Sequence, residues 1–228
     1  MRRVLLLDGS THSEIYTPAA DWRRLLGDVP SVSAHLPSGE AVPDLGSFSH
    51  VIVTGSEASI MRPEPWFEVE AAAVCEAVSR GLCVLGSCFG HQMLAWALAD
   101  GKHVARSPTP EVGWIEVERT ADDPLLTGLE SPLHVFACHF DEVREPPAPW
   151  RTLARSRGCA VQLVRYGDRP VWGLQAHPEM GPTAARTLME GILTRHPDKA
   201  GVVRPALETQ PHDDEVAGAI VDRFLEAG

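Results

Sequence analysis

Short apolar runs alternate with longer helical patterns over the first hundred residues, and this alternation constrains the fold more than any other feature of the sequence. Val4–Leu7, Val51–Thr54 and Leu82–Leu85 have the length and composition of buried strands. Residues 66–80 carry apolar side chains at helical spacing, and Gly81 follows where a helix would end. Strands separated by helices in this way predict a parallel sheet with helices on both faces.

The second half of the chain has strand-like runs that follow one another directly. These runs are Trp114–Val117, His134–Ala137, Ala160–Val164 and Val171–Leu174. Two helical stretches close the chain, near Thr183–Thr194 and Asp214–Leu225. Residues 195–213 contain three prolines and are predicted to form a surface loop. No linker marks a boundary, so we predict one domain over residues 1–228, a three-layer α/β/α sandwich around a mostly parallel sheet.

Composition and charge restrict the class of protein. The 228 residues are 44% hydrophobic and 22% charged, as in ordinary globular proteins, and carry a net charge of −11. This acidity argues against nonspecific nucleic-acid binding and against anchoring on an anionic membrane, because both depend on Lys and Arg. No apolar run reaches the length of a membrane span, and the apolar run after Arg3 is too short for a signal peptide. We therefore expect a cytoplasmic protein without nucleic-acid or membrane partners.

The cysteines indicate neither a disulfide framework nor a metal site. Their number, five, is odd, and no C-x-x-C pair occurs. Neither glycine-rich nucleotide-binding signature, G-x-x-x-x-G-K-[ST] or G-x-G-x-x-G, is present. We therefore predict no cofactor and no metal. Four of the cysteines are interpreted as core residues: Cys75, Cys83, Cys138 and Cys159, with Cys138 also a candidate for lining a pocket.

The fifth cysteine lies in the segment with the clearest chemistry. Gly86 ends an apolar strand, Cys88 follows two residues later, and Gly90 opens a helix. Small residues on both sides of a nucleophile permit a sharp strand-to-helix turn that lifts its side chain above the sheet. The helix N-terminus favours the reactive thiolate, and the backbone N–H of Phe89 is a candidate donor to a developing oxyanion. The alternative is a buried cysteine in a tight turn.

A second segment supplies a candidate base. A strand runs into His177, and Pro178 and Glu179 follow it. Residues two apart in an extended or turn segment point the same way, so Glu179 is placed to orient the imidazole. A thiol nucleophile requires such a base, and the base requires such a partner. The alternative is a surface turn whose His and Glu side chains are merely solvated.

Together these segments resemble the class I glutamine amidotransferases, which use a Cys-His-Glu triad. The family's cysteine motif is matched by Gly86, Cys88, Gly90 and Gln92, and its Gln-x-His-Pro-Glu motif by Gln175, His177, Pro178 and Glu179. Two further stretches fit: Val53–Ser56 is similar to the family's oxyanion strand, and Ala137–Val143 to its Ser-His-x-Asp-x-Val element. The four matches stand in the family's order over about residues 1 to 180.

The resemblance implies a flavodoxin-like fold, the hydrolysis of glutamine or another γ-glutamyl compound, and a set of site residues. These are the triad (Cys88, His177 and Glu179), the oxyanion hole (Gly55 and Phe89) and contacts to the substrate (Gln92, His139 and Phe140). Within the family, the chain most resembles free-standing members similar to the glutaminase part of GMP synthase. It departs at Ala137–Cys138, where many relatives have Ser before the His.

Three functions stay open at this point. The first is an amidotransferase subunit that passes ammonia to a separate synthetase subunit. The second is a self-sufficient hydrolase of γ-glutamyl peptides or amides. The third is a non-catalytic binding or regulatory module, against which the intact motifs count. The sequence neither chooses between the first two nor names an acceptor or an oligomeric state.

Overall fold

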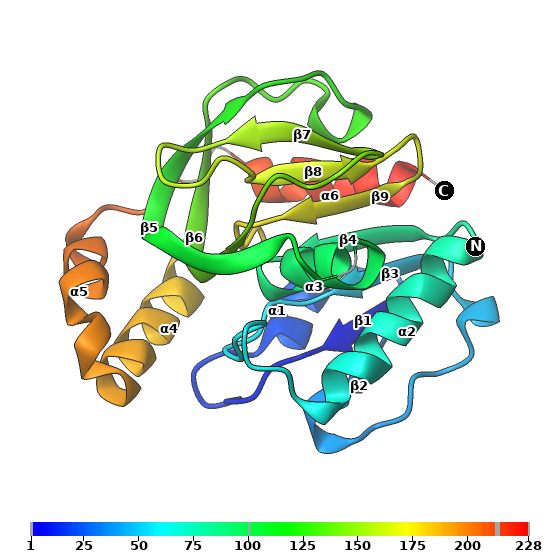
Figure 1. Cartoon of the computed structure of the whole chain (residues 1–228), viewed down its shortest axis with the longest axis horizontal. Coiled ribbons are helices and arrows are strands. Elements are labelled where there is room, and N and C mark those ends of the chain that lie inside the picture. The colour runs from blue at the N-terminus through cyan, green and yellow to red at the C-terminus, as the bar shows by residue number, and fades with distance from the viewer. Residues whose placement is uncertain (1, 100, 213–214, 228) are drawn as a thin grey trace.

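The structure is a computed structural model that describes residues 2–99, 101–212 and 215–227. Its strands form one nine-stranded sheet in the order β2-β1-β3-β4-β9-β8-β7-β5-β6 (Figure 1). Five neighbouring strands run parallel: β2 (Ser31–His35), β1 (Val4–Asp8), β3 (His50–Val53), β4 (Cys83–Ser87) and β9 (Val171–Leu174). Four strands extend them in antiparallel fashion: β8 (Leu163–Tyr166), β7 (Trp150–Arg155), β5 (Val104–Arg119) and β6 (Leu133–Val143).

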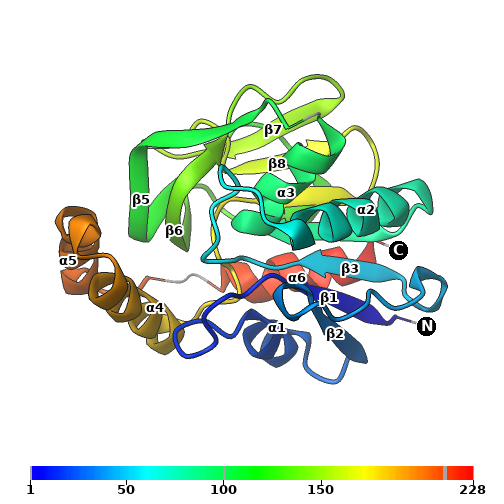
Figure 2. The same ribbon diagram turned by 60° about the horizontal axis from the view of Figure 1, so that its bottom comes forward.

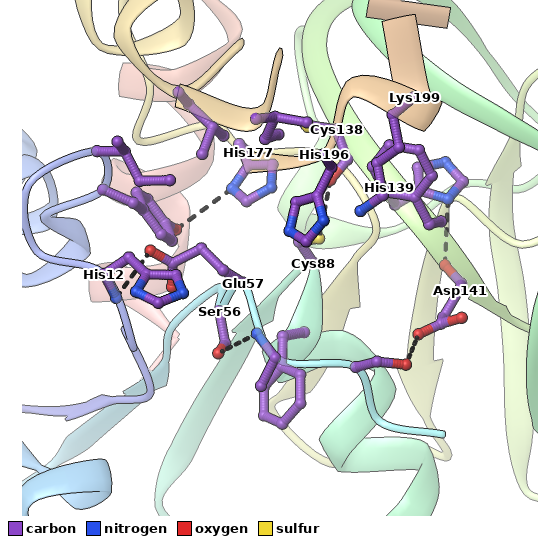
Figure 3. Close-up of a pocket in the computed structure, with 18 of the residues that line it drawn as sticks. His12, Ser56, Glu57, Cys88, Cys138, His139, Asp141, His177, His196 and Lys199 are labelled. Carbon is purple, nitrogen blue, oxygen red and sulfur yellow. Dashed lines mark hydrogen bonds between the residues drawn. The ribbon is translucent and has the colours of Figure 1, made fainter. Parts of the chain in front are cut away.

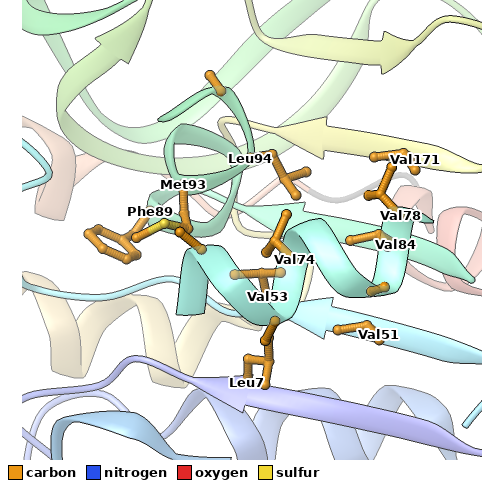
Figure 4. Close-up of a cluster of buried hydrophobic side chains, with 14 of the residues drawn as sticks. Leu7, Val51, Val53, Val74, Val78, Val84, Phe89, Met93, Leu94 and Val171 are labelled. Atoms are coloured by element: carbon orange, nitrogen blue, oxygen red, sulfur yellow. The ribbon is translucent and has the colours of Figure 1, made fainter. Parts of the chain in front are cut away.

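Helices cover both faces of the parallel strands (Figure 2). The helices of the described residues are α1 (Pro18–Leu26), α2 (Pro65–Ser79), α3 (Phe89–Leu98), α4 (Pro182–Arg195), α5 (Ala200–Glu208) and α6 (Val216–Glu226). Because side chains alternate along β1, Leu5 and Leu7 belong to the core under α2 and α3, and Val4 and Leu6 to the core under α1 and α6. Figure 4 shows the first of these cores, with Val74 of α2 above the strands. The predicted three-layer α/β fold is confirmed.

The pair α4 and α5 lies beside the β5–β6 hairpin, away from the two main layers (Figure 1). It covers a third apolar cluster, to which Phe136 of β6, Met189 of α4 and Val203 of α5 contribute. Gly113 of β5 has φ +110°, and a Cβ there would lie 3.0 Å from the Cβ of Ala206 in α5. The absence of a side chain at Gly113 therefore allows α5 to pack closely on β5.

The surface loop predicted at residues 195–213 is wrong for much of its length. The segment contains the 3₁₀ turn η4 (Pro197–Lys199) and then α5, with Pro205 inside the helix. A proline in a helix interior costs about 3 kcal/mol, which is why the sequence favoured a loop. Burial of Val203 and Ala206 in the third cluster outweighs this preference, and that packing depends on strands distant in the sequence.

Several strand and helix boundaries also differ from the prediction. β5 and β6 extend beyond the runs predicted at Trp114–Val117 and His134–Ala137, and β7 was not predicted. The strand predicted at Ala160–Val164 lies later, at β8, because a turn closed by the Ser156 N–H and the Cys159 carbonyl occupies the preceding residues. Asp214, where the last helix was predicted to begin, lies outside the described residues, and α6 is described from Val216. None of the helices in the described ranges combines the length and apolar character needed to cross a membrane.

Candidate active site

Cys88 occupies a strand-to-helix turn between β4 and α3. It caps the N-terminus of α3 with φ 47° and ψ −100°, a positive-φ conformation that is uncommon for a residue with a side chain. The two flanking glycines are required sterically. A Cβ at Gly90 would lie 2.0 Å from the carbonyl oxygen of Val53, and one at Gly86 would lie 2.6 Å from the backbone of Gly90. The predicted elbow around the cysteine is therefore present.

The surroundings of the Cys88 thiol are mostly backbone and amide groups. Its Sγ atom lies 3.6 Å from the carbonyl oxygen of Cys138 and 3.6 Å from Nε2 of Gln175. Phe89, the next residue, begins α3, so its N–H has no acceptor within the helix. The ring of Phe89 packs against Trp66 in the core, which leaves the backbone as the part of Phe89 that belongs to the site.

His177 and Glu179 form a buried hydrogen-bonded pair. Nδ1 of His177 donates to Oε1 of Glu179 at 2.8 Å, as the two-residue spacing predicted. The same carboxylate accepts hydrogen bonds from the hydroxyls of Tyr16 at 2.6 Å and Ser87 at 3.0 Å. Sequence reasoning missed both hydroxyls. Ser87 stands next to the cysteine and was available as a signal, whereas Tyr16 lies in the loop after β1, with nothing local to link it to Glu179.

Burial and neighbouring charges shift the pKa values of His177 and Glu179 in opposite directions. Burial alone would lower the pKa of His177, but the negative charges of Cys88 and Glu179 outweigh it and raise that pKa well above its usual value. Burial likewise opposes ionisation of Glu179, but the charge and hydrogen bond of His177 and the hydrogen bond of Tyr16 lower the carboxyl pKa. The protonated imidazole of His177 and the carboxylate of Glu179 therefore stabilise each other.

Gly55, the predicted oxyanion residue, lies directly beside the histidine. A Cβ at Gly55 would come within 2.7 Å of Cε1 of His177 and 2.4 Å of the hydroxyl oxygen of Tyr16. Only a glycine fits at this position without displacing one of the two rings. The structure thus places the end of β3, the elbow and the His–Glu turn around one small volume.

The three predicted substrate contacts line the same pocket as Cys88. Nε2 of Gln92 donates to the Asp141 carbonyl at 2.8 Å. The ring nitrogens of His139 lie 3.2 Å from the same carbonyl and 3.1 Å from Oε2 of Glu111. The polar atoms of Gln92 and His139 thus hold the wall of the pocket, and the half-buried ring of Phe140 is available at its mouth.

Residues that the sequence did not single out complete the pocket, as the side chains in Figure 3 show. Arg195 and His196, at the end of α4, and Lys199 of η4 line it from the side of the segment predicted as a loop. His12 and Glu57, from the loops after β1 and β3, line it too. Sequence periodicity could not place Arg195, His196 and Lys199 in the pocket, because only the packing of α4 and α5 brings their segment over the cysteine.

The other four cysteines differ in exposure. Cys83, Cys138 and Cys159 are buried as predicted, but Cys75 is exposed, so its assignment to the core was wrong. Burial raises the pKa of the Cys138 thiol to about 12, which keeps it neutral in the pocket wall. Within the described ranges, no group of three or more His, Cys, Asp or Glu side chains could hold a metal ion.

The site has a cysteine at a strand-to-helix elbow and a buried His–Glu pair at the same edge of a parallel sheet. This arrangement is typical of α/β enzymes that use a cysteine nucleophile. A sequence model of the family described as class I glutamine amidotransferase matches residues 40–192. The chain belongs to this family, as the resemblance in its motifs predicted.

Curated relatives carry names connected with GMP synthase. A subunit of the glutamine-hydrolyzing GMP synthase of Methanothermobacter thermautotrophicus is 33% identical over 148 residues, which are 65% of this chain and 78% of that protein. The glutamine-hydrolyzing GMP synthase of Aeropyrum pernix is 38% identical over 145 residues, or 64% of this chain. The chain spans only 26% of the length of the Aeropyrum protein and 52% of that of the corresponding GMP synthase subunit from Pyrococcus abyssi.

Solved structures share the fold over nearly the whole chain. A glutamine amidotransferase from Thermotoga maritima superposes with a TM-score of 0.82 at 25% identity and covers 99% of this chain and 96% of its own. One from Methylobacillus flagellatus has a TM-score of 0.75 at 20% identity, with 99% and 94% covered.

Proposed function

We propose that this protein hydrolyses the side-chain amide of glutamine through a γ-glutamyl thioester on Cys88. The thiolate attacks the amide carbon, and the backbone N–H groups of Gly55 and Phe89 stabilise the oxyanion that forms. His177, oriented by Glu179, gives its proton to the departing nitrogen, so that ammonia leaves. The same imidazole then takes a proton from water, which attacks the thioester and releases glutamate. One glutamine and one water thus become glutamate and ammonia.

One observation carries this proposal above the others. His177, joined to the buried Glu179 at 2.8 Å, lines the same pocket as a cysteine held in a positive-φ elbow. A carboxylate with three side-chain donors and a histidine of raised pKa fit a proton-transfer site. They do not fit a solvated surface turn. The presence of Cys88, His177 and Glu179 together also counts against a non-catalytic binding module.

We further propose that the ammonia goes to a separate synthetase subunit. Two observations support this: the relatives named as GMP synthase subunits match this chain over much of its length, and the family match covers a large part of the chain. Gln92, His139 and Phe140 remain the proposed walls of the substrate pocket, the first two through the contacts that fix them and Phe140 through its ring.

An electrophilic analogue of glutamine tests the nucleophile. We expect it to modify Cys88 alone, because only this thiol lies beside the proposed oxyanion donors, and Cys88→Ala to abolish both labelling and turnover. Peptide mass spectrometry locates the modification. Exposed Cys75 is the matched control: a general alkylating reagent should reach it, and Cys75→Ser should leave analogue labelling unchanged. Labelling that persists at the original rate in Cys88→Ala would show that the nucleophile is wrong.

A further inference from the structure

Lys199 is a lysine in a chain that has few of them, and it lines the candidate active site. The sequence contains two lysines, Lys102 and Lys199, and its net charge is −11. Lys199 is half-buried, belongs to η4 and lines the pocket that contains Cys88. Its Nζ atom lies 3.9 Å from the centroid of the Phe140 ring, and the guanidinium carbon of Arg106 lies 5.9 Å from the same centroid. Two cations therefore gather around one aromatic ring at the mouth of the site.

The other charges at this mouth are already occupied. Arg106 pairs with Asp141 at 3.1 Å, and Arg195 pairs with Glu14. The carboxylate of Glu57 accepts the backbone N–H groups of Thr11 at 2.9 Å and His12 at 3.1 Å.

Lys199 differs from these groups. Within the described ranges it forms no ion pair with a carboxylate, and the only described polar contact of its side chain is with the ring of Phe140. Burial lowers the pKa of Lys199, as does the charge of Arg106, and the nearby carboxylates of Asp198 and Asp141 only partly oppose this. A half-buried cation with these surroundings would be stabilised by an anion bound in the pocket.

Lys199 lies outside the part of the chain that matches the family model. The family match ends at residue 192, before η4. The residue reaches the pocket because α5, which follows η4, packs on β5 at Gly113. Lys199 is thus supplied by a part of this chain that lies beyond the residues matched by the family model.

We propose that Lys199 binds a carboxylate of the substrate and makes the site selective for γ-glutamyl compounds that present one. This inference rests on the proposed function for its substrate, and it adds the group that the substrate must carry. The carboxylate has two possible sources: the α-carboxylate of the γ-glutamyl part, or a carboxylate on the amine that leaves.

The contact acts away from the reacting amide, so it should affect binding more than chemistry. We expect Lys199→Gln to raise KM about tenfold with little change in kcat, the result of losing one charge-assisted contact made equally in ground and transition states. Lys199→Arg should retain much of the affinity, because it keeps the charge. Lys102→Gln removes the other lysine and is the matched control, for which both constants should stay unchanged.

Paired substrates identify the source of the carboxylate. If it is the α-carboxylate, the wild-type protein prefers glutamine over glutamine α-amide, and Lys199→Gln erases this preference. If it belongs to the amine, the wild type prefers γ-glutamylglycine over γ-glutamyl methylamide, and Lys199→Gln erases that one instead. Either pattern supports the proposal. Preferences that are the same in wild type and Lys199→Gln would overturn it.

A binding measurement separates this inference from the proposed function. Reductive ¹³C-methylation labels the two lysines without removing their charge, and Lys102→Arg assigns the NMR signals. In Cys88→Ala, which cannot form the thioester, saturable movement of the Lys199 signal on adding glutamate or γ-glutamylglycine is the expected result. If the wild-type protein turns over no amide and the Lys199 signal of Cys88→Ala still moves, the proposed reaction is rejected and the carboxylate site is kept. An unmoved Lys199 signal with both ligands would overturn the site, whatever the turnover.

Discussion

Glu179 shows how much of the site depends on single hydroxyl groups. Its carboxylate is fully buried, and a buried charge is tolerated only when its hydrogen-bonding capacity is met. Tyr16 donates the shortest of the three side-chain hydrogen bonds to it, at 2.6 Å. Burial, and then the charge of Glu179, raise the pKa of Tyr16 well above its usual value, so that the phenol stays a donor. Tyr16 is therefore a positioning residue for the pair of His177 and Glu179.

Replacing Tyr16 by Phe should remove this donor and keep the ring. We expect Tyr16→Phe to lower kcat/KM about tenfold, because a hydrogen bond to a buried charge is lost. The pH at which activity rises should also move upward, since Glu179 would be less stabilised as an anion. Steady-state rates over a pH series from acidic to alkaline measure both effects. The chain's other tyrosine supplies the control: Tyr166→Phe, in β8, should behave as wild type. Equal rates for the two variants would remove Tyr16 from the site.

The pattern of local and distant contacts explains which site residues the sequence could predict. The positions of Cys88, His177 and Glu179 follow from short motifs in which neighbours two residues apart cooperate, and the structure brings these three together. Tyr16 and Lys199 reach the pocket only through the packing of their segments. No run of adjacent residues encodes that packing, so periodicity and motif spacing could not have found them.

Glu70 is a buried carboxyl group in the core that, unlike Glu179, has no hydrogen-bond donor among the described residues. It lies on α2 with its side chain fully buried. Burial, and then the charge of Asp8, raise its pKa well above its usual value. The folded protein therefore keeps this proton at pH values where the unfolded chain has released it. Stability must fall as the pH rises above the unfolded pKa of about 4.5, until the higher folded pKa is reached.

Substitution of Glu70 by Met should remove this dependence. We expect Glu70→Met, which is of similar size and apolar, to raise the melting temperature more at mildly alkaline pH than at a pH below the unfolded pKa. Thermal unfolding followed by circular dichroism at both pH values measures the difference. Glu68→Met, on the exposed side of the same helix, is the control and should have little effect at either pH. An equal gain at the two pH values would show that Glu70 is not protonated in the folded state.

At the scale of elements, the accuracy of the sequence predictions followed the strength of the periodic signal. β1, β9 and α2 were predicted within about one residue because their apolar patterns reflect burial on sheet and helix faces. α5 was missed because Pro205 signals a break and the helix is short. The helix α5 is stabilised by its contact with β5, and this contact cannot be predicted from the residues of α5 alone.

Gly113 offers a test of how α5 is held. We expect Gly113→Val to destabilise the protein by about 1–3 kcal/mol, because its side chain would collide with Ala206 and because φ +110° suits glycine alone. If α5 loosens, residues 196–212 should become sensitive to limited proteolysis, and KM should rise as Lys199 loses its position. Gly201→Ala, in α5 itself, meets no atom within 4 Å and is the control, with equal or higher stability expected. A proteolysis pattern identical to that of wild type would show that α5 does not depend on this approach.

At the scale of the whole molecule, the chain spans only part of the length of some curated relatives, and the assignment of residues 1–228 to one domain stays a prediction.

The charge of the molecule is unevenly distributed around the candidate site. The molecule is strongly acidic, yet the rim of its candidate site carries Arg106, Arg195 and Lys199. Arg106 and Arg195 are paired with Asp141 and Glu14, so of these three cations Lys199 is the one left to attract a small anion.

The dependence on a partner separates the two catalytic functions that the sequence left open. Ammonia released into neutral water is mostly protonated and no longer nucleophilic, so an enzyme that supplies it benefits from staying slow until it docks. Docking needs a complementary surface of typically about 800 Å² on each partner.

We therefore expect weak glutaminase activity for the isolated protein and at least a severalfold increase on adding the cognate synthetase. Coupled assays of glutamate release, with glutamine and a γ-glutamyl peptide compared in the pure protein, measure this. Cys88→Ala with the synthetase is the control for background. Rapid turnover of the peptide alone, with negligible action on glutamine, would reject the amidotransferase function and favour a self-sufficient γ-glutamyl hydrolase that uses the same Cys88, His177 and Glu179.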